Sequence, residues 1–250
     1  MYEYTSPILV IKIGTQALLG EHEAPRVMFD RLASAIQNLS QTYRVVLVTS
    51  GAIGFGVRAL GLVSRPTGVD QLQALAMIGQ AGLLRRWREA FGETMIGQVL
   101  VTRRDLAEPL STETLRHSIE ALWAYGAIPV VNENDAVSYE EISFGDNDKL
   151  AAEIAAAIHA STLVLLTDQD GIQAHFGTSR QHRLKETSVR EMAQHIAPTK
   201  SVLGKGGFAS KIMAASLALE AGVDVYIGSL NATPDVNDII SGKSGSRIVQ

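Results

Sequence analysis

The strongest constraint on the fold is a repeated alternation of short β-branched runs with longer stretches rich in alanine and leucine. The short runs are apolar nearly throughout, which is typical of strands buried on both faces of a sheet. They predict strands at Ile8–Ile13, Val45–Thr49, Ile96–Val101, Ala127–Val131, Leu163–Thr167 and Val223–Ile227. The longer stretches predict helices at Val27–Leu39, Gln71–Phe91, Glu113–Tyr125, Lys149–His159 and Phe208–Ala221. This alternation predicts an α/β fold with a mainly parallel open sheet and helices on both sides.

Two stretches interrupt the alternation. Residues 132–148 are acidic and have turn-forming residues at both ends, and residues 173–206 are polar without a clear period. Ligands of open parallel sheets bind beyond the carboxyl ends of the strands, so these interruptions are expected to hold the functional site. The second stretch also marks the approximate place where an N-terminal lobe would pass into a C-terminal one.

The composition excludes several kinds of site. The chain of 250 residues has no cysteine, which removes disulfides, thiolate nucleophiles and cysteine metal ligands. A net charge of -4 argues against a nucleic-acid binder, and the scattered histidines contain no H-E-x-x-H motif. The N-terminus has no signal-peptide pattern, and no apolar run is long enough to cross a bilayer. We therefore expect a cytoplasmic protein that binds neither nucleic acid nor membranes.

Two features of the N-terminal half suit an anionic ligand. Lys12 lies in an apolar strand just before Gly14. It would either neutralise a phosphate or extend its ammonium group from the strand end into water. The strand at Val45–Thr49 leads into Ser50-Gly51-Ala52 and further glycines. This turn would be either an anion-binding helix N-terminus or a tight connection that requires small residues.

A polar cluster follows in the middle of the chain. Asn132-Glu133-Asn134-Asp135 comes after one predicted strand, and Gly145-Asp146-Asn147-Asp148 opens a predicted helix. These side chains suit an ammonium group, a hydroxyl group or a magnesium shell. Helix capping by Asp146 or Asn147 explains one of them but not the whole set, so we favour a functional site.

Two segments of the C-terminal half suit a nucleotide. Thr167-Asp168-Gln169-Asp170-Gly171 ends a buried strand, which is where a parallel sheet presents groups to a nucleotide, although Asp-Gly is also common in simple turns. The glycine-rich segment Gly204–Lys211 leads into a helix and has the outline of a phosphate-binding loop. It does not match the Walker A pattern, and Lys205 is also compatible with a mobile surface lysine.

Together these segments resemble the amino acid kinase family, and within it the branch that phosphorylates glutamate. The matching stretches occur in family order from residue 10 to about residue 225: VIKIGT, VVLVTSGAIGFG, QALAMIGQ, GQVLVTRRDL, IPVVNENDAVSYEEISFGDND, LVLLTDQDGI and GKGGFASKIMAASLALEAGVD. The resemblance implies a three-layer αβα sandwich in a single domain. An N-terminal lobe, about residues 1–165, would bind the amino acid, and a C-terminal lobe, about residues 166–250, would bind ATP.

The resemblance also implies residue roles. Lys12 and Lys211 would flank the transferred phosphoryl group, Asp148 would orient both lysines, and Asp146 would help to shape the same site. The implied glutamate-binding residues are Ser50, Gly51, Ala52, Asn134, Asp135 and Asn147. The implied ATP-binding residues are Lys12, Thr167, Asp168, Lys205, Gly206, Gly207, Phe208, Ala209, Ser210 and Lys211. No protein ligand for a metal is assigned.

The chain departs from the family pattern in four places. Lys205 stands where threonine is usual, Phe208 where methionine is usual, and Gln16 where serine is common. Residues 173–180 read QAHFGTSR and lack the usual tyrosine and D-P-R segment, so the resemblance does not fix nucleotide affinity or preference. The sequence also ends near the end of the kinase domain, which implies a form without the C-terminal PUA domain of many relatives.

The function implied by the resemblance is ATP- and Mg²⁺-dependent phosphorylation of the side-chain carboxylate of L-glutamate, the first step of proline biosynthesis. Such kinases are expected to form homodimers or homotetramers. Two alternatives stay open at this point. The chain could be a relative that phosphorylates acetylglutamate, aspartate or UMP, or a non-catalytic sensor of an amino acid or nucleotide on the same fold.

Overall fold

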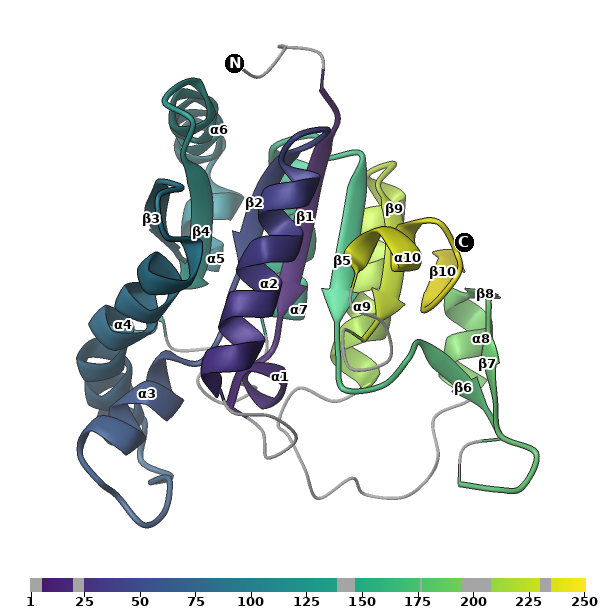
Figure 1. Cartoon of the computed structure of the whole chain (residues 1–250), viewed down its shortest axis with the longest axis horizontal. Helices are drawn as coiled ribbons and strands as arrows, with labels where there is room; N and C mark the ends of the chain where they lie inside the picture. The colour runs from purple at the N-terminus through teal and green to yellow at the C-terminus, as the bar shows by residue number, and fades with distance from the viewer. Residues whose placement is uncertain (1–5, 20–24, 139–146, 176, 195–207, 230–234) are drawn as a thin grey trace.

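The computed structural model describes residues 6–19, 25–138, 147–175, 177–194, 208–229 and 235–250. Within these residues an eight-stranded sheet has the strand order β3-β4-β2-β1-β5-β9-β10-β8 (Figure 1). The neighbouring pairs are parallel except β9 and β10, which are antiparallel. A separate antiparallel hairpin joins β6 and β7. The strands are β1 Ile8–Ile13, β2 Arg44–Val48, β3 Ile96–Val101, β4 Ile128–Glu133, β5 Thr162–Leu166, β6 Ile172–Ala174, β7 His182–Leu184, β8 Glu186–Ser188, β9 Asp224–Gly228 and β10 Ser246–Val249.

Helices cover both faces of the sheet and give the expected three layers. One core joins the sheet to α6, α7, α8 and α9, and the other joins it to α2, α4 and α10. Figure 1 shows α2 and α10 in front of the sheet and α7 and α9 behind it. The helices are α1 Thr15–Leu19, α2 Pro25–Leu39, α3 Ala52–Ala59, α4 Val69–Phe91, α5 Arg103–Ala107, α6 Pro109–Ala124, α7 Asp148–Ala157, α8 Val189–Gln194, α9 Phe208–Glu220 and α10 Val236–Ile240.

The long elements agree with the sequence prediction, and the short ones were missed. Each predicted strand and helix is present, with its ends moved by a few residues. Local periodicity did not predict β6, β7, β8, β10 or the short helices, because elements of three to eight residues contain too few repeats of a pattern. The predicted division near residue 165 stays a prediction, and one sheet runs through both parts.

The interpretation of β3 as a strand buried on both faces was wrong. This strand lies at the edge of the sheet and pairs only with β4, so most of its residues are partly or fully exposed. Leu100, for example, is 40% exposed. The run is apolar like those of the central strands, and composition alone does not distinguish an edge strand from a central one.

The register of β1 places Lys12 at the future site. Alternate residues of this strand face opposite layers, and Val10 belongs to the core shared with α7 and α9. Lys12 therefore points toward the same layer. It is paired with Val48 of β2 on one side and with Leu165 of β5 on the other. The parallel strands β1, β2 and β5 thus have their C-terminal ends on the same side of the sheet, and Lys12 on β1 lies between β2 and β5 there.

Close contact between α3 and α4 fixes the turn after β2. A Cβ atom on Gly79 would lie 1.9 Å from the carbonyl oxygen of Ala52, and one on Gly56 would lie 2.1 Å from that of Leu75. Only glycine therefore permits the two backbones to approach this closely. Gly51, which precedes α3, has φ 116°, a conformation that also favours glycine. The tight-turn interpretation of this segment accounts for these glycines.

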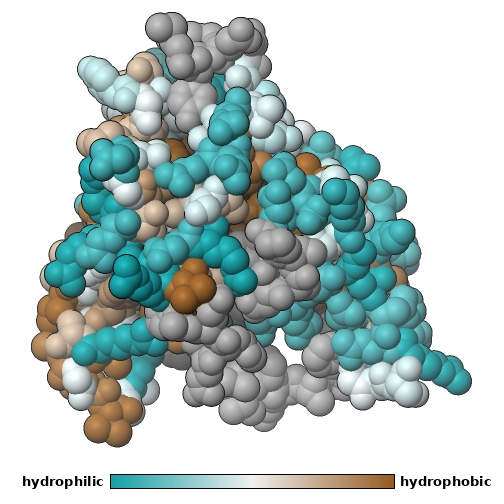
Figure 2. Space-filling view, viewed as in Figure 1, coloured by the Kyte–Doolittle hydropathy of each residue, from teal (hydrophilic) through white to brown (hydrophobic). Residues whose placement is uncertain are grey.

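The surface seen in Figure 2 is mostly polar, with apolar side chains gathered at the lower left over α3 and α4. Leu60, Leu62 and Val63, in the loop that follows α3, are exposed. Among the described residues, no helix combines the length and apolar character needed to span a bilayer.

Candidate active site

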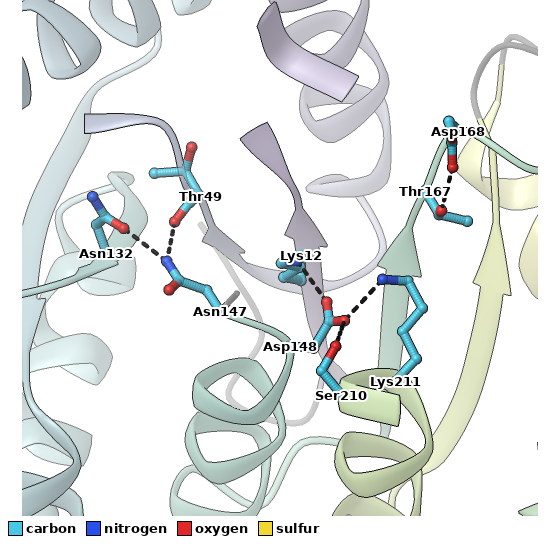
Figure 3. A network of polar contacts seen from close by, with 9 residues as sticks. All are labelled: Lys12, Thr49, Asn132, Asn147, Asp148, Thr167, Asp168, Ser210 and Lys211. Atoms are coloured by element: carbon cyan, nitrogen blue, oxygen red, sulfur yellow. Dashed lines mark hydrogen bonds and ion pairs between the residues drawn. The ribbon is translucent and has the colours of Figure 1, made fainter. Parts of the chain in front are cut away.

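Two lysines distant in the sequence contact one buried carboxylate (Figure 3). Lys12 lies near the end of β1, Asp148 is the first residue of α7, and Lys211 lies in the first turn of α9. The Nζ atom of Lys12 is 2.6 Å from Asp148 Oδ1, and that of Lys211 is 2.9 Å from Asp148 Oδ2. Lys12 and Lys211 therefore converge on Asp148 from the central strand and from a helix behind the sheet.

The charges at this point explain why the arrangement is stable. Asp148 has no exposed surface, and a buried carboxylate is costly unless it is paired. Both ammonium groups compensate it, the hydroxyl of Ser210 donates a hydrogen bond of 3.0 Å to Oδ2, and the N-terminus of α7 favours a negative charge. Among the described residues at this contact, two cations face one anion, an arrangement that suits a phosphoryl group.

A cavity of about 320 Å³ lies at the ends of β2 and β4. Most of the predicted acceptor-binding residues line it: Ser50, Gly51, Ala52, Asp135 and Asn147. Asn134 lines an adjoining cavity of about 270 Å³, which shares Ala52 and Asp135 with the first. The fold thus brings together two segments that are far apart in the chain, the turn after β2 and the loop after β4.

The cavity contains charges of both signs. Burial, and next the nearby Glu133, raise the pKa of Asp135 to about 7, while Arg65 lowers it. Arg65 and Arg58 line the same cavity. The guanidinium of Arg58 donates a 3.0 Å hydrogen bond to the carbonyl of Leu19, whereas Arg65 has no hydrogen bond or ion pair within the described part of the chain. An α-amino acid carries a positive and a negative group that match these residues.

A chain of carboxamides joins the cavity to α4. The Nδ2 group of Asn147 donates hydrogen bonds of 2.6 Å to the carbonyl of Thr49 and 2.8 Å to Oδ1 of Asn132 (Figure 3). Asn132 in turn donates a 2.8 Å hydrogen bond to Oε1 of Gln80. Asn147 was predicted either to cap α7 or to bind a ligand. No capping hydrogen bond from its side chain is found, so the amide serves this network instead.

The predicted nucleotide-binding residues that the structure describes lie just after the C-terminal end of β5 and in the first turn of α9. The hydroxyl of Thr167 donates a 2.9 Å hydrogen bond to Asp168, which is exposed. Phe208 and Ala209 begin α9, and Ser210 is turned toward Asp148. Lys205, Gly206, Gly207 and the predicted catalytic Asp146 lie outside the described residues.

The structure favours the simple-turn interpretation of Asp170-Gly171. Oδ1 of Asp170 accepts a 2.7 Å hydrogen bond from the backbone of Gly245, and Gly171 has φ 78°. These contacts hold the start of the β6–β7 hairpin against the C-terminal segment. Asp170 is thus occupied by a structural contact.

Sequence reasoning missed several residues of the cavity, chiefly Thr15, Arg58, Arg65 and the supporting Gln80. Arg65 lies in an exposed loop without a recognisable pattern, so only the folded chain brings it beside Asp135. Gln80 belongs to the QALAMIGQ stretch, which contributed to the resemblance without an assigned role. Within the described residues, no group of three or more His, Asp or Glu side chains is arranged to hold a metal ion.

The chain is similar in sequence to known proteins. The chain is 35% identical over 243 residues to a glutamate 5-kinase of Clostridium acetobutylicum, covering 93% of this chain and 90% of that protein. It is 37% identical over 244 residues to a glutamate 5-kinase of Gloeobacter violaceus, where the match covers 94% of this chain and 66% of the relative. The chain therefore spans nearly the whole of one relative and about two thirds of the other.

The fold also matches solved structures. A carbamate kinase from Giardia lamblia bound to AMP-PNP superimposes with a TM-score of 0.69 at 16% identity, covering 98% of this chain and 99% of that one. At this identity the likeness concerns the fold alone. A sequence model of the amino acid kinase family matches residues 7–229. This match covers most of the chain, which therefore belongs to the amino acid kinase family.

Proposed function

We propose that this chain transfers the γ-phosphoryl group of ATP to the side-chain carboxylate of L-glutamate, giving L-glutamyl 5-phosphate and ADP. The observation that carries this proposal is the buried contact of Lys12 and Lys211 with Asp148, at the end of the sheet that also holds a cavity of mixed charge. The names of the relatives in Clostridium and Gloeobacter support the same acceptor. In a cell, the product would enter proline biosynthesis.

The cavity supplies a partner for each end of the amino acid. Asp135 and the carboxamide oxygen of Asn147 would accept hydrogen bonds from the α-ammonium group, and Arg65 would pair with the α-carboxylate. Ser50 and the turn after it would help to hold the substrate, with its side-chain carboxylate directed toward Lys12. Asn134, beside the second cavity, supports the same loop.

The transfer itself needs placement and positive charge. A carboxylate oxygen of glutamate forms a bond to the γ-phosphorus, the bond from that phosphorus to the bridging oxygen breaks, and its electron pair leaves with ADP. The attacking carboxylate is already ionised, so no general base is needed. Lys12 and Lys211 would reduce the repulsion between the two anionic substrates, and Asp148 would keep both ammonium groups in position.

ATP would lie at the ends of β5 and α9, against Thr167, Asp168 and the segment from Phe208 to Lys211. The part of the chain that the structure describes offers no cluster of metal ligands, so we assign Mg²⁺ to the phosphates of ATP and to no particular side chain. When bound there, Mg²⁺ supplies further positive charge to the transferred group. The cytoplasmic location and the homo-oligomeric state stay predictions.

The mixed charge of the cavity favours a free amino acid over the alternative acceptors. N-acetylglutamate has no ammonium group to pair with Asp135, and UMP offers neither an ammonium group nor an α-carboxylate. Aspartate has both groups but is one methylene shorter, so its side-chain carboxylate would lie farther from Lys12. A sensor would bind such ligands without turnover.

The test is ATP consumption by the purified chain with glutamate, N-acetylglutamate, aspartate or UMP, with hydroxylamine present to trap an acyl phosphate. We expect glutamate-dependent release of ADP and formation of γ-glutamyl hydroxamate. Faster turnover of another acceptor would replace glutamate in the proposal. Tight binding of glutamate and ATP without any ADP release would favour the sensor.

A further inference from the structure

The QALAMIGQ stretch, residues 73–80, lies on α4 beneath the cavity, and the proposed reaction gives it no role. Its last residue, Gln80, lines the second cavity and accepts the hydrogen bond from Asn132. The residue before it, Gly79, permits the close approach of α3. Gln80 is thus held close to the turn after β2, which lines the first cavity.

The direction of every amide in this network follows from one backbone group. The carbonyl of Thr49 can only accept a hydrogen bond, so the side chain of Asn147 must present its NH₂ group there. The same NH₂ group also donates to Asn132. Oδ1 of Asn147 receives no hydrogen bond from the described residues, and Asn147 lines the cavity, so this oxygen is available to a donor on a ligand.

Asn132 is fixed in turn by its two neighbours. Its Oδ1 accepts from Asn147, so its own NH₂ group must point the other way, to an acceptor. Oε1 of Gln80 is that acceptor, at 2.8 Å. If the Asn132 amide were reversed, its NH₂ group would face the NH₂ group of Asn147, and its oxygen would face Oε1 of Gln80. Buried mismatches of this kind are costly. Asn132 is 3% exposed, so water does not readily replace the lost partner.

The other end of the network is also held by α4. Trp87 lies seven residues, or about two turns, after Gln80 and hence on the same face of the helix. Its indole N–H donates a 3.1 Å hydrogen bond to Oγ1 of Thr49. One helix face therefore positions both Thr49 and Asn132, the two acceptors of Asn147.

We propose that Gln80 is a positioning residue for amino-acid recognition: by accepting the hydrogen bond from Asn132 it holds Asn132 in place as the second acceptor of Asn147 and, together with the carbonyl of Thr49, keeps the carboxamide oxygen of Asn147 directed at the substrate's α-ammonium group. The inference rests on the proposed function, because it takes glutamate as the ligand of the cavity. Gln80 does not itself contact the substrate. It makes the pocket prefer a ligand that donates hydrogen bonds at this position.

The test compares the binding of L-glutamate with that of glutarate, which has the same carboxylates but no ammonium group. In Gln80→Met, which removes the acceptor at similar side-chain length, we expect the glutamate affinity measured by calorimetry to fall about tenfold. Glutarate affinity should change less than about twofold, since the lost interaction involves the ammonium group alone. In turnover, the KM for glutamate should rise while kcat and the KM for ATP stay within about threefold.

Two variants complete the design. Gln80→Glu keeps an acceptor for Asn132, so the preference for glutamate over glutarate should be at least that of the wild type. Its added charge near Glu133 and Asp135 should repel glutarate, a dianion, more than glutamate, so the charge shifts the ratio of affinities toward glutamate as well. Gln71→Met is a matched exchange at an exposed position of α4 and should change nothing. Gln80→Leu replaces Gln80→Met if thermal unfolding shows that the latter does not fold.

Equal weakening of glutamate and glutarate in Gln80→Met would mean that Gln80 only supports packing, and would overturn the inference. An unchanged affinity ratio, or a wild type without preference for glutamate over glutarate, would also overturn it. Hydroxamate formation by the wild type tests the proposed function separately. A chain that binds glutamate through its ammonium group but forms no hydroxamate would lose the function and keep the inference.

Discussion

The acceptor side and the nucleotide side of the site are built differently. On the acceptor side, Lys12, Thr49, Ser50, Asn132 and Asn147 are all buried, and all of them except Ser50 are joined by polar contacts to neighbouring elements. On the nucleotide side, Thr167 is partly exposed and Asp168 is exposed, and the two side chains are hydrogen-bonded to each other. The described acceptor residues are thus held mostly by contacts within the fold, whereas the described nucleotide residues present separate groups at strand and helix ends. We therefore expect larger effects from changes on the acceptor side.

Lys211 joins the two sides, so its removal should have the largest effect. Lys211→Ala should lower kcat on the order of 10²-fold or more, since one of two cations at the transferred group is lost. Lys12 would still pair with Asp148, so the variant should fold normally by circular dichroism. Lys149→Ala is the control, because the ion pair of Lys149 within the described part of the chain is with Glu153, at 3.7 Å. A kcat close to wild type in Lys211→Ala would remove Lys211 from the catalytic residues.

Asp135 tests the acceptor side through pH. Its pKa is raised to about 7, chiefly by burial, so kcat/KM for glutamate should fall as the pH drops below this value and the carboxylate is protonated. Asp135→Asn should lose this dependence, and its glutamate affinity at pH 8 should be about thirtyfold weaker, as for a lost bond to a charged group. A variant that keeps the wild-type pH profile would show that another group titrates.

The same pKa predicts a stability effect with a definite sign. Asp135 titrates at 3.8 without perturbation and at about 7 in the folded chain, so the folded state holds the proton more tightly. The protonated Asp135 carboxyl therefore contributes to the unfolding free energy at low pH, and this contribution is lost as the pH rises toward 7. Wild type should therefore lose unfolding free energy relative to Asp135→Asn between pH 4 and pH 8, measured by urea denaturation.

Arg65 should have a smaller effect that is confined to the acceptor. Arg65→Gln should raise the KM for glutamate about tenfold, because the exposed guanidinium is partly screened by water. The KM for ATP should not change. Arg85→Gln serves as the matched control, since Arg85 is exposed on α4 and lies 3.8 Å from Glu89. A larger change in the KM for ATP than in the KM for glutamate would show that Arg65 acts on the nucleotide and not on the acceptor.

Thr167 should give the smallest effect, on the nucleotide alone. Thr167→Val keeps the shape of the side chain and removes the hydroxyl that donates to Asp168. We expect the KM for ATP to rise about threefold, the size of one neutral hydrogen bond, with the KM for glutamate unchanged. Initial rates at varied ATP and fixed glutamate measure this. An effect larger than that of Arg65→Gln would reverse the comparison between the two sides.

The long elements of the fold and the chemical character of the site were predictable from the amino-acid sequence alone. Buried strands such as β1 and amphipathic helices such as α2 were predictable, because their patterns repeat several times within one element. The loop that bears Asp135 and Asn147 was recognised as a polar interruption, and the turn that bears Ser50 was recognised as a glycine-rich turn after an apolar strand. Their assignment to a kinase came from the resemblance, since neither a glycine turn nor an acidic loop defines a reaction.

Which of these groups come into contact depends on the folded chain and was not predictable from local patterns. The contact of Lys12 with Asp148 and Lys211 joins three elements that are distant in the chain, and Arg65 reaches Asp135 from a loop without a pattern. The direction of the Asn132 and Asn147 amides depends on the carbonyl of Thr49 and on Gln80. Sequence periodicity records whether a side chain is buried, but hydrogen-bond direction and charge pairing arise from contacts across the fold, where each group is fixed by a partner that the local pattern does not contain.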